Sequence, residues 1–335
     1  MAEINILNIQ PHKISRDMRG FSVLIYGEPK IGKTTAACRF PKNLLLAAEV
    51  GYNAIPGAMV QPITTWGDFK KVLKQLKQPE AQQAFYTITL DTVDLFYDFC
   101  TRFILQQNGV DKLSDIPYGQ GYGLVAKEFD DCLRQILQLG YGLVMISHST
   151  DKVFKDETGT EFNKIVPTLD KRARLVTSRM ADIYGYARAV QLEDGTTVPK
   201  LFLRGTPRFE AGSRFPYIPD YIDFNYNALV NAIHDCVDKQ MAENDKDLFA
   251  EKRDNLYAEN ATTYDFDGLM SEFSSIIESL VGNNTEEEFE TNWAPRVQEV
   301  VEKVLGKGKK VNQMTRDQAE LLSIIVDELN DIIKK

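Results

Sequence analysis

Short apolar runs alternate with helix-period stretches over the first 150 residues. Short unbroken runs of apolar and β-branched residues are typical of strands that are covered on both faces. Four such runs occur, at Phe21–Tyr26, Asn43–Ala48, Phe85–Leu90 and Tyr141–Ser147. Helical patterns lie between them, at Thr34–Phe40, Trp66–Lys77, Thr92–Gln107 and Leu124–Leu139. The alternation predicts an α/β fold with a mostly parallel central sheet.

The pattern changes twice further along the chain. After Ser147, turn sequences at Asp156–Gly159 and Asp194–Gly195 separate alternating runs, which predicts an antiparallel extension of the sheet. From about Asn227 the pattern is helical, at Ala228–Asp254, Phe266–Leu280, Glu287–Val304 and Arg316–Lys334. We therefore predict a core over residues 1–220 and a helical C-terminal region over residues 221–335.

Charge separates the same two regions. Residues 235–335 carry 23 Asp and Glu against 12 Lys and Arg, a net charge of -11. The remaining residues carry 25 and 27, a net charge of +2. The overall acidity therefore belongs to the helical region. A nearly neutral core can still present a local basic surface, so a nucleic-acid partner is not excluded.

The apolar and cysteine content indicates a soluble protein of a reducing compartment. No run of about 18 apolar residues could cross a bilayer, and the N-terminus lacks the pattern of a secretory signal. We expect a cytoplasmic protein without a membrane partner. The four cysteines stand singly in apolar stretches and are predicted to be reduced core thiols: Cys38, Cys100, Cys132 and Cys236.

A phosphate-binding motif connects the first predicted strand to the first predicted helix. Residues 27–34, GEPKIGKT, fit G-x-x-x-x-G-K-[ST] in the strand-to-helix context that the motif requires. Backbone N–H groups would surround the β-phosphate, Lys33 would reach the β- and γ-phosphates, and the Thr34 hydroxyl would coordinate Mg²⁺. ATP and Mg²⁺ are the predicted cofactors. The predicted nucleotide contacts are Gly27, Glu28, Pro29, Lys30, Ile31, Gly32, Lys33, Thr34 and Thr35.

Two acidic residues near the end of the third predicted strand compete for the second magnesium position. Asp91 directly follows the apolar run and suits a carboxylate that holds Mg²⁺. Asp94 lies three residues further on, where a carboxylate more commonly caps the following helix. We therefore assign the metal to Thr34 and Asp91.

Glu49 is the candidate for orienting the attacking water. An enzyme that hydrolyses a phosphoanhydride uses a polar group to position that water. Glu49 ends the second predicted strand, which lies immediately beside the strand of the phosphate loop if the sheet is wound in the usual way. An exposed strand-end carboxylate without a catalytic role is the alternative.

Five segments together resemble a known family. They are GEPKIGKT, AAEVG at the end of the second strand, TLDTVDLF, ISHSTDK and LRGTPRFEAGSRF, and they span Phe21 to Phe215. In order and spacing the chain resembles phage-encoded RecA-like ATPases, including Sak-type single-strand annealing recombinases and phage AAA-type nucleotide-binding proteins. The resemblance implies a RecA-like P-loop NTPase core with Glu49 as catalytic glutamate. It also implies that Ser147 and His148 sense the γ-phosphate and pass the signal to a mobile DNA-binding loop. A surface histidine without such a role is the alternative for His148.

Two segments correspond in order to the DNA-binding loops of that family. In Gly109–Gly123, Tyr118 and Tyr122 could stack on bases, although a plain surface loop is the alternative. The second segment runs from Ser149 to about Lys171. It leads into a basic cluster that could follow a phosphate backbone or form a solvated helix face, with Lys171, Arg172 and Arg174 as candidates.

Three arginines near the end of the core are candidates for an arginine finger. In ring or filament ATPases a basic side chain of a neighbouring copy often stabilises charge on the transferring phosphoryl group. Arg204, Arg208 and Arg214 occupy the corresponding part of this chain. Binding to DNA, or pairing with the acidic region, is the alternative for each. A finger of this kind implies a homo-oligomer, either a ring or a short filament.

These features lead to a functional prediction. We predict a DNA-dependent ATPase that binds single-stranded DNA and promotes strand annealing in homologous recombination, with a single-strand-binding protein as a further candidate partner. The alternative on the same core is a ring-forming DNA helicase or helicase loader of phage replication. A small-molecule kinase is less favoured, because no arginine-rich lid segment interrupts the core.

Overall fold

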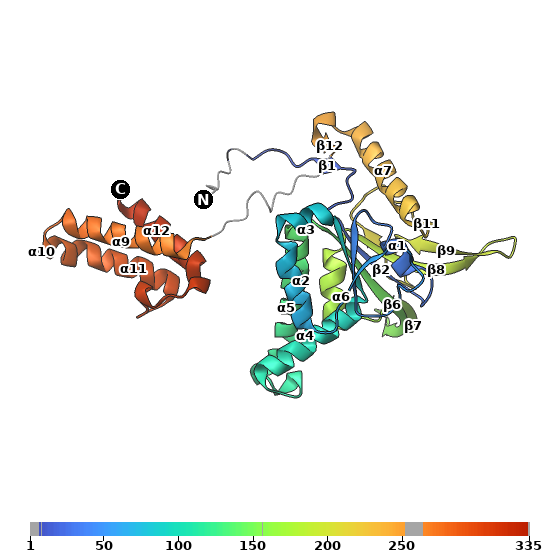
Figure 1. Ribbon diagram of the computed structural model, residues 1–335, viewed down its shortest axis with the longest axis horizontal. Coiled ribbons are helices and arrows are strands. Elements are labelled where there is room, and N and C mark those ends of the chain that lie inside the picture. The colour runs from blue at the N-terminus through green and yellow to red at the C-terminus, as the bar shows by residue number, and fades with distance from the viewer. Residues whose placement is uncertain (1–6, 8, 156, 252–263, 334–335) are drawn as a thin grey trace. The chain divides into compact units, whose positions relative to one another are not determined.

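The computed structural model describes residues 7, 9–155, 157–251 and 264–333. These form two compact units: the first contains the elements from β1 to β12, and the second contains those from α9 to α12 (Figure 1). In the described residues, no helix combines the length and the apolar character needed to cross a membrane.

A ten-stranded sheet forms the centre of the first unit. Its order is β11-β9-β8-β2-β6-β5-β3-β4, with β10 beside β8 and β7 beside β6. The strands are β2 (Ser22–Gly27), β3 (Asn43–Ala47), β4 (Met59–Pro62), β5 (Thr87–Asp91), β6 (Gly142–Lys155), β7 (Glu161–Pro167), β8 (Ile183–Gln191), β9 (Thr197–Phe202), β10 (Gly212–Ser213) and β11 (Tyr221–Asp223). The pairings from β8 through to β4 are parallel, and those of β7, β9, β10 and β11 are antiparallel. The predicted α/β fold with a mostly parallel sheet is therefore confirmed.

Helices cover both faces of this sheet (Figure 1). The helices of the first unit are α1 (Lys33–Ala37), α2 (Trp66–Leu76), α3 (Pro79–Ala84), α4 (Val93–Asn108), α5 (Gly121–Gln138), α6 (Lys171–Met180) and α7 (Tyr226–Glu243). One hydrophobic core joins α2, α4, α5 and α6 to the sheet, and a second joins α1 and α7 to the opposite face. Short 3₁₀ turns connect the longer helices, at η2 (Leu113–Asp115), η3 (Pro117–Gly119) and η4 (Lys246–Leu248). A small parallel sheet pairs β1 (Ile14–Ser15) with β12 (Phe249–Ala250).

The unbroken apolar run in β2 follows from burial on both faces. Successive side chains of a strand point to opposite sides of the sheet. Accordingly, Leu24 and Tyr26 join the core beneath α4 and α5, whereas Val23 and Ile25 join the core beneath α7. All four are at most 1% exposed. This strand therefore has no polar face, and the phosphate loop begins at the end of a rigid element.

Helix α7 belongs to the sheet unit, which corrects the predicted boundary at residue 220. Its apolar face places Leu229, Ile233 and Val237 in the same hydrophobic core as Val23 and Ile25 of the loop strand. The division between the two units falls after β12 rather than at residue 220. The sequence pattern did not show that α7 belongs to the sheet unit, because it did not reveal that α1 has only five residues. The sheet face beside so short a helix needs a second helix to cover it, and α7 supplies that cover.

Two elements of the first unit have too little hydrophobic pattern to be predicted. Strand β4 lies at the edge of the sheet, is mostly exposed and contains Pro62, which an edge strand tolerates. Helix α6 is mostly polar and buries only Ala173, Thr177 and Met180. It begins where the Asp170 carboxylate accepts a hydrogen bond from the Arg172 backbone N–H at 2.8 Å. A side-chain cap therefore marks this helix more clearly than hydrophobic periodicity does.

The second unit is a helical bundle with its own core. Its elements are α9 (Phe266–Gly282), α10 (Glu286–Glu288), the π-helical turn η5 (Phe289–Trp293), α11 (Ala294–Leu305), the 3₁₀ turns η6 (Val311–Gln313) and η7 (Arg316–Gln318), and α12 (Ala319–Ile333). Leu322, Ile325 and Leu329 of α12 pack against α9 and α11 in a cluster separate from the two cores of the sheet unit. The predicted helical C-terminal region is thus present, although it begins later than predicted.

None of the four cysteines forms a disulfide. Cys100, Cys132 and Cys236 are buried among apolar neighbours, as predicted for core thiols, and Cys38 is half-buried. Burial raises the pKa of the Cys132 thiol to about 12. That side chain is therefore protonated and unreactive at neutral pH.

We predict that Ile233→Ala destabilises the sheet unit by about 2–5 kcal/mol, because Ile233 is fully buried under β2 and truncation leaves a cavity. Leu175→Ala, on the exposed side of α6, is the control and is expected to cost about 0.5 kcal/mol or less. Urea unfolding of the full chain measures both values. Equal effects of the two substitutions would contradict the assignment of α7 to the sheet unit.

Candidate nucleotide site

The predicted phosphate loop joins β2 to α1 as the motif requires. Gly27 ends β2, and Gly32 precedes the helix with a φ of 100°, a conformation that favours glycine. Gly27 is needed for another reason, because a Cβ there would lie 2.1 Å from the carbonyl oxygen of Ala187 in β8. The first glycine of the motif therefore permits close strand pairing, and the second permits the turn into the helix. Of the other predicted nucleotide contacts, Glu28, Pro29, Lys30 and Thr35 are exposed and Ile31 is half-buried.

Lys33 lies beneath the loop with its ammonium group folded back onto it. Nζ donates hydrogen bonds to the carbonyl oxygens of Gly27 at 2.8 Å and Glu28 at 2.7 Å. The residue is only 5% exposed, and burial lowers the pKa of the ammonium group, while the carboxylates of Asp91 and Glu49 act in the opposite direction. These carboxylates favour the charged form, which is the form that attracts a phosphate.

Thr34 and Asp91 meet at the centre of the site. The Thr34 hydroxyl donates a hydrogen bond of 2.7 Å to Oδ2 of Asp91, which lies at the carboxyl end of β5 and is 4% exposed. Burial raises the pKa of the Asp91 carboxyl, and the Thr34 hydrogen bond opposes the shift. A cation between these two oxygens would replace that hydrogen bond and favour the ionised carboxylate. One hydroxyl and one carboxylate fit Mg²⁺, which usually keeps several waters and takes its remaining ligands from phosphate.

Gly51 leaves space beside this pair. A Cβ at Gly51 would lie 3.6 Å from Oγ1 of Thr34 and 3.8 Å from Oδ2 of Asp91. A side chain at this position would therefore stand against the two candidate metal ligands. Gly51 was not among the predicted site residues, and its place two residues after Glu49 in AAEVG was the signal in the sequence.

Glu49 lies in the site, but its strand occupies a different position in the sheet from the predicted one. The expectation that its strand lies immediately beside the loop strand is wrong, because β6 and β5 separate β3 from β2. The Ala48 and Glu49 N–H groups instead donate to the carbonyl oxygen of Asp91, at 2.7 and 3.3 Å. Parallel strands end at a common edge, so a strand three positions away still brings its last side chain to the cluster.

The Glu49 carboxylate has two polar neighbours. Its Oε1 accepts a hydrogen bond of 2.9 Å from the Thr92 hydroxyl, and its Oε2 lies 3.6 Å from Nε2 of His148. The side chains of Glu49 and His148 are 39% and 33% exposed, so both face solvent in part. Thr92 was not among the predicted site residues, and its position directly after Asp91 was the signal in the sequence. The peptide bond between those two residues is cis.

Asp94 is part of the site's surroundings and not a helix cap. Prediction of a cap was wrong, because Oδ1 of Asp94 accepts hydrogen bonds from the hydroxyls of Ser147 at 3.1 Å and Thr168 at 2.6 Å. A hydroxyl from β6 and one from the residue just after β7 thereby engage the same carboxylate oxygen. Burial raises the pKa of this carboxyl. Thr168, which had no signal in the sequence, connects this cluster to the chain just before α6.

His148 lies within a long strand and not at the start of a loop. β6 continues past the predicted end at Ser147 to Lys155 and pairs with β7 in a hairpin, in register from Ser149 opposite Pro167 to Lys155 opposite Glu161. The loop expected over Ser149 to Lys171 is therefore mainly a hairpin followed by the cap of α6. The turn sequence at Asp156–Gly159 was the correct indication of this structure, although residue 156 itself lies outside the described residues.

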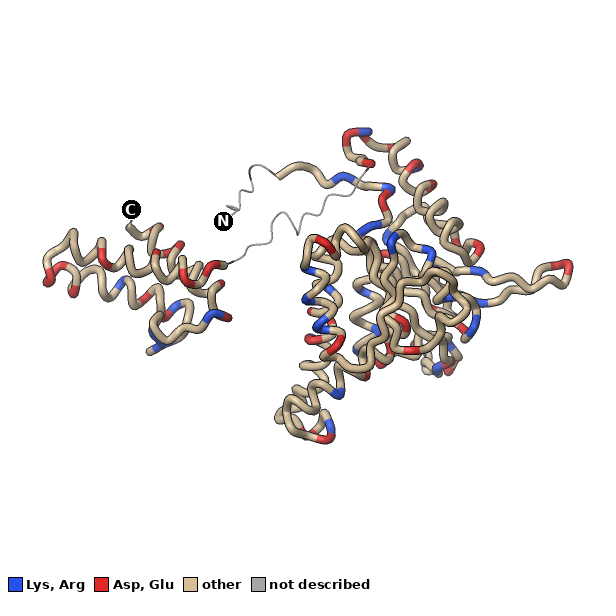
Figure 2. Tube along the Cα trace, in the orientation of Figure 1, with Lys and Arg blue, Asp and Glu red and all other residues tan. Residues whose placement is uncertain are grey.

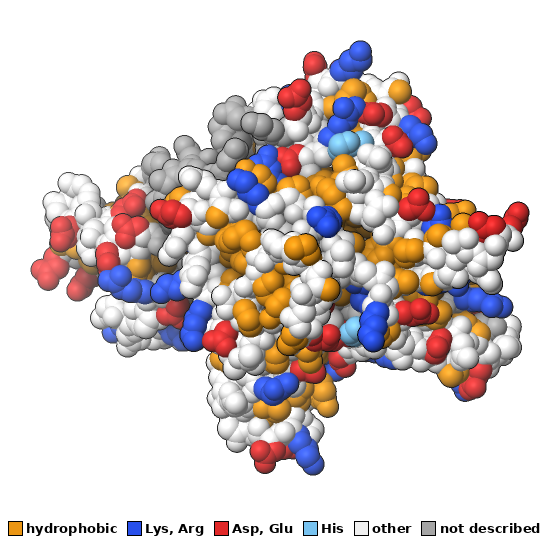
Figure 3. Space-filling view, turned by 45° about the vertical axis from the view of Figure 1, so that its right-hand side comes forward, with side chains coloured by type: hydrophobic (Ala, Val, Ile, Leu, Met, Phe, Trp, Pro, Cys, Tyr) orange, Lys and Arg blue, Asp and Glu red, His pale blue; other side chains and the backbone are white. Residues whose placement is uncertain are grey.

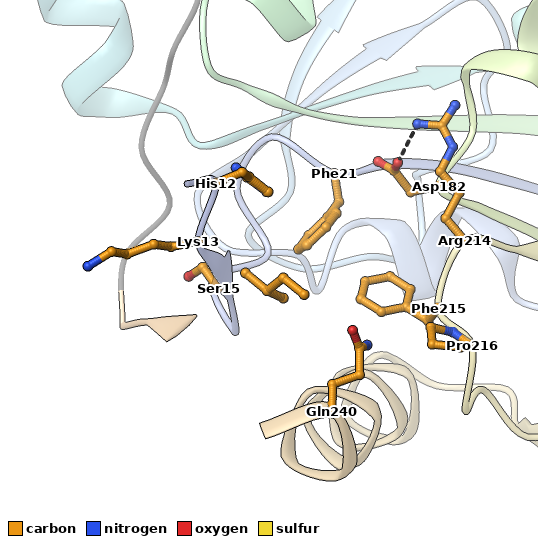
Figure 4. Close-up of a pocket in the computed structure, with 10 residues that line it drawn as sticks. His12, Lys13, Ser15, Phe21, Asp182, Arg214, Phe215, Pro216 and Gln240 are labelled. Carbon is orange, nitrogen blue, oxygen red and sulfur yellow. Dashed lines mark hydrogen bonds and ion pairs between the residues drawn. The ribbon is translucent and has the colours of Figure 1, made fainter. Parts of the chain in front are cut away.

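The three candidate finger arginines differ in their surroundings. Arg204 donates to the carbonyl oxygens of Ile218 and Pro216, at 3.2 and 2.7 Å. Arg214 pairs with Asp182 at 2.9 Å and lies beside a pocket of about 290 Å³ at the amino ends of β2 and β8, the edge opposite to the phosphate loop (Figure 4). Arg208 is exposed, and within the described residues its guanidinium forms no ion pair.

The candidate DNA-binding side chains form a partial cluster. The Tyr118 side chain is 96% exposed on the projection between α4 and α5, and the Arg172 guanidinium lies 4.5 Å from the ring centroid of Tyr122. Lys171 is exposed in the first turn of α6. Arg174 does not fit the prediction of a DNA contact, because its side chain is only 15% exposed and points to Glu210 at 4.0 Å.

Comparisons with known proteins agree with this geometry. The AAA domain family matches residues 19–215, which include the sheet strands from β2 to β10, the phosphate loop and the acidic cluster. The chain is also 32% identical over 340 residues to the SPbeta prophage-derived uncharacterized protein YorG of Bacillus subtilis (strain 168), covering 98% of this chain and 99% of that protein. A family match of this length and a relative of this similarity, together with the loop geometry, show that the chain belongs to the AAA domain family of P-loop ATPases.

Proposed function

We propose that this protein hydrolyses ATP with Mg²⁺ at the cluster formed by Lys33, Thr34, Glu49 and Asp91. Lys33 binds the β- and γ-phosphates, and Thr34 and Asp91 hold the metal. The observation that carries the proposal is the 2.7 Å contact between Thr34 and Asp91 at the end of the phosphate loop. Bound Mg²⁺ would neutralise charge on the phosphates as the terminal bond breaks.

Glu49 is proposed to orient the attacking water. Its carboxylate is partly exposed, and the Thr92 hydroxyl holds one of its oxygens, which leaves the other oxygen for a water. His148 lies 3.6 Å from that second oxygen and pairs in register with Gly27 at the start of the phosphate loop. A change at the γ-phosphate would therefore reach His148 directly. Its strand then leads into the β6–β7 hairpin, which supports its proposed role as the γ-phosphate sensor.

The proposed nucleic-acid partner is single-stranded DNA. Exposed aromatic rings stack on bases, and an arginine that lies over a tyrosine ring places a cation beside the same contact. Tyr118, Tyr122 and Arg172 provide these groups, and Lys171 adds a cation beside them. α6 begins just after Thr168, which bonds to Asp94 near the nucleotide cluster. This short connection supports a DNA-dependent ATPase.

A homo-oligomer is proposed to complete the active site. Figure 3 shows hydrophobic side chains gathered over the middle of one face of the sheet unit, which suits contact with another copy. Val50, next to Glu49, is 73% exposed, and Met59 is 55% exposed. Arg208 is the favoured finger, because Arg204 and Arg214 are engaged within their own chain.

The biological role that we propose is strand annealing in phage recombination with a RecA-like core, and the prophage origin stated in the name of the relative supports a phage setting. A helicase or helicase loader is the alternative outcome. Rapid DNA-stimulated turnover with strand separation would favour that alternative, whereas annealing with slow turnover favours recombination.

Glu49→Gln is expected to lower kcat for ATP hydrolysis by about a hundredfold or more, because the amide cannot accept the proton of the attacking water. Affinity for a fluorescent ATP analogue should change little, whereas Lys33→Ala should lose most of that affinity. Glu80→Gln, on exposed α3, is the control and should leave both measurements unchanged. Wild-type turnover in Glu49→Gln would exclude Glu49 from catalysis.

Arg208→Ala is expected to lower kcat by about a thousandfold, the usual contribution of an arginine finger. Mixing this variant with Lys33→Ala distinguishes the two sources of the arginine. If a neighbouring copy supplies Arg208, the mixture regains activity, since one variant offers an intact loop and the other an intact arginine. Arg214→Ala is the control. No recovery in the mixture would contradict a finger supplied by a neighbour.

Replacing Tyr118 or Tyr122 by alanine is expected to weaken single-stranded DNA binding about tenfold, because each ring stacks on a base. Lys171→Ala should instead lower the slope of log affinity against log salt concentration by about 0.7, since one phosphate contact is lost. Tyr221→Ala, on the edge strand β11, is the matched control. Unchanged binding in both tyrosine variants would exclude this surface as the DNA site.

A further inference from the structure

The C-terminal helical unit contains a groove that the nucleotide site does not use. Its volume is about 460 Å³, and it lies among α9, η5, α11 and the loop that follows α11. Its wall is largely apolar, with contributions from Phe273, Ile277, Phe289, Val297, Val301 and Val311. Val301 and Val311 are almost fully buried, whereas the other four are half-buried and leave apolar surface open to the groove.

A π-helical turn helps to form this groove. η5 begins after a capping box, in which Thr285 and Glu288 exchange hydrogen bonds between side chain and backbone. The wide turn brings Phe289 to the groove just before α11 begins at Ala294. Single π-helical turns occur frequently at functional sites, because the wider turn displaces side chains from the regular helical positions.

A lysine-rich loop borders the groove. Gly306 and Gly308 have φ angles of 96° and 78°, and the Gly308 N–H donates to Oε1 of Glu302 at 3.3 Å. These constraints give the loop a defined turn and present Lys309 and Lys310 at the margin of the groove. Both residues are exposed, and within the described part of the helical unit neither ammonium group forms an ion pair.

These lysines contrast with the charge of the rest of the unit. Residues 264–333 contain 15 Asp and Glu against 6 Lys and Arg, and Figure 2 shows acidic residues along much of this unit. Three of the six cations are already engaged. Lys303 pairs with Glu328 at 2.7 Å, Arg316 pairs with Asp267 at 2.7 Å, and Arg296 lies over the Trp293 ring. The remaining cations all lie in the loop over residues 307–310.

We propose that this groove binds an acidic peptide segment of a partner protein that carries a large apolar side chain. The apolar side chain enters the groove against Phe273, Val297 and Val301, and the carboxylates of the peptide face Lys309 and Lys310. Charge complementarity selects this occupant, because two exposed lysines without an ion pair among the described residues, Lys309 and Lys310, border the apolar groove of an acidic unit. A nucleic acid is disfavoured, since a phosphate backbone would meet the surrounding carboxylates.

The experiment uses the full chain and a fluorescein-labelled peptide, Asp-Asp-Asp-Phe-Leu, in an anisotropy titration. Two matched probes replace either the acidic residues by lysine or the Phe-Leu pair by Ser-Ser. The test variant is Lys309→Glu with Lys310→Glu, which changes exposed side chains only. Lys74→Glu with Lys77→Glu, two exposed residues at the end of α2 and just after it, makes the same change of charge on the other unit.

We expect the acidic peptide to bind, and to bind about tenfold more weakly to the test variant and also when Ser-Ser replaces its apolar pair. The Lys74/Lys77 control and Lys33→Ala should bind like the wild type, which separates this site from ATP binding. Circular dichroism verifies that each variant is folded.

Several results would overturn the proposal. These are equal binding of the lysine-substituted peptide, unchanged binding to the test variant, or competition by single-stranded DNA, which would make the groove a nucleic-acid site. A fourth result has two parts: the peptide does not bind the wild type, and the test variant loses an oligomer that the wild type forms, as measured by sedimentation. That result would make the groove a contact between copies of this chain. Absence of binding without such a change would also exclude an acidic peptide as the occupant.

Discussion

Parallel pairing of β2 with β6 on one side and β8 on the other is the constraint on which the nucleotide site depends. The register sets Gly27 opposite His148 in β6 and opposite Ala187 in β8. Because β2 is buried on both faces, neither neighbour can shift by one residue without exposing apolar side chains. The start of the phosphate loop, His148 and the close approach at Gly27 are therefore fixed together. Glu49 and Asp91 arrive at the same edge because β3 and β5 run in the same direction.

Much of the sheet unit could be predicted from the sequence, because its strands and longer helices have clear patterns. β2, β5, α2 and α4 are found within two residues of their predicted bounds. The strand order could not be predicted, since every buried parallel strand has the same apolar character. Only contacts distant in sequence decide which strands are neighbours. This explains why Glu49 was assigned to the site while the reason given, adjacency to β2, was wrong.

The connections within the site were harder to predict than its principal members. Lys33 and Thr34 belong to a motif with fixed spacing, and Asp91 directly follows an apolar run, so linear patterns identify all three. Thr168 bonds to Asp94 across 74 residues of chain, and no local pattern marks such a contact. Arg174 shows the opposite problem, because three basic residues within four positions look alike in sequence. Only the fold shows that one of them turns inward to Glu210 while the other two remain exposed.

The length of β6 has a mechanical consequence. The first part of this strand lies in the central sheet and the second part forms the hairpin with β7, without a break at His148. Lys155 lies seven positions after His148, a span of about 23 Å at the usual rise per residue. A continuous strand of this kind moves as one element when it tilts. A tilt of about 5° where it leaves the sheet displaces the tip of the hairpin by about 2 Å. A small rearrangement beside the phosphate loop would thus be enlarged at a surface far from the nucleotide.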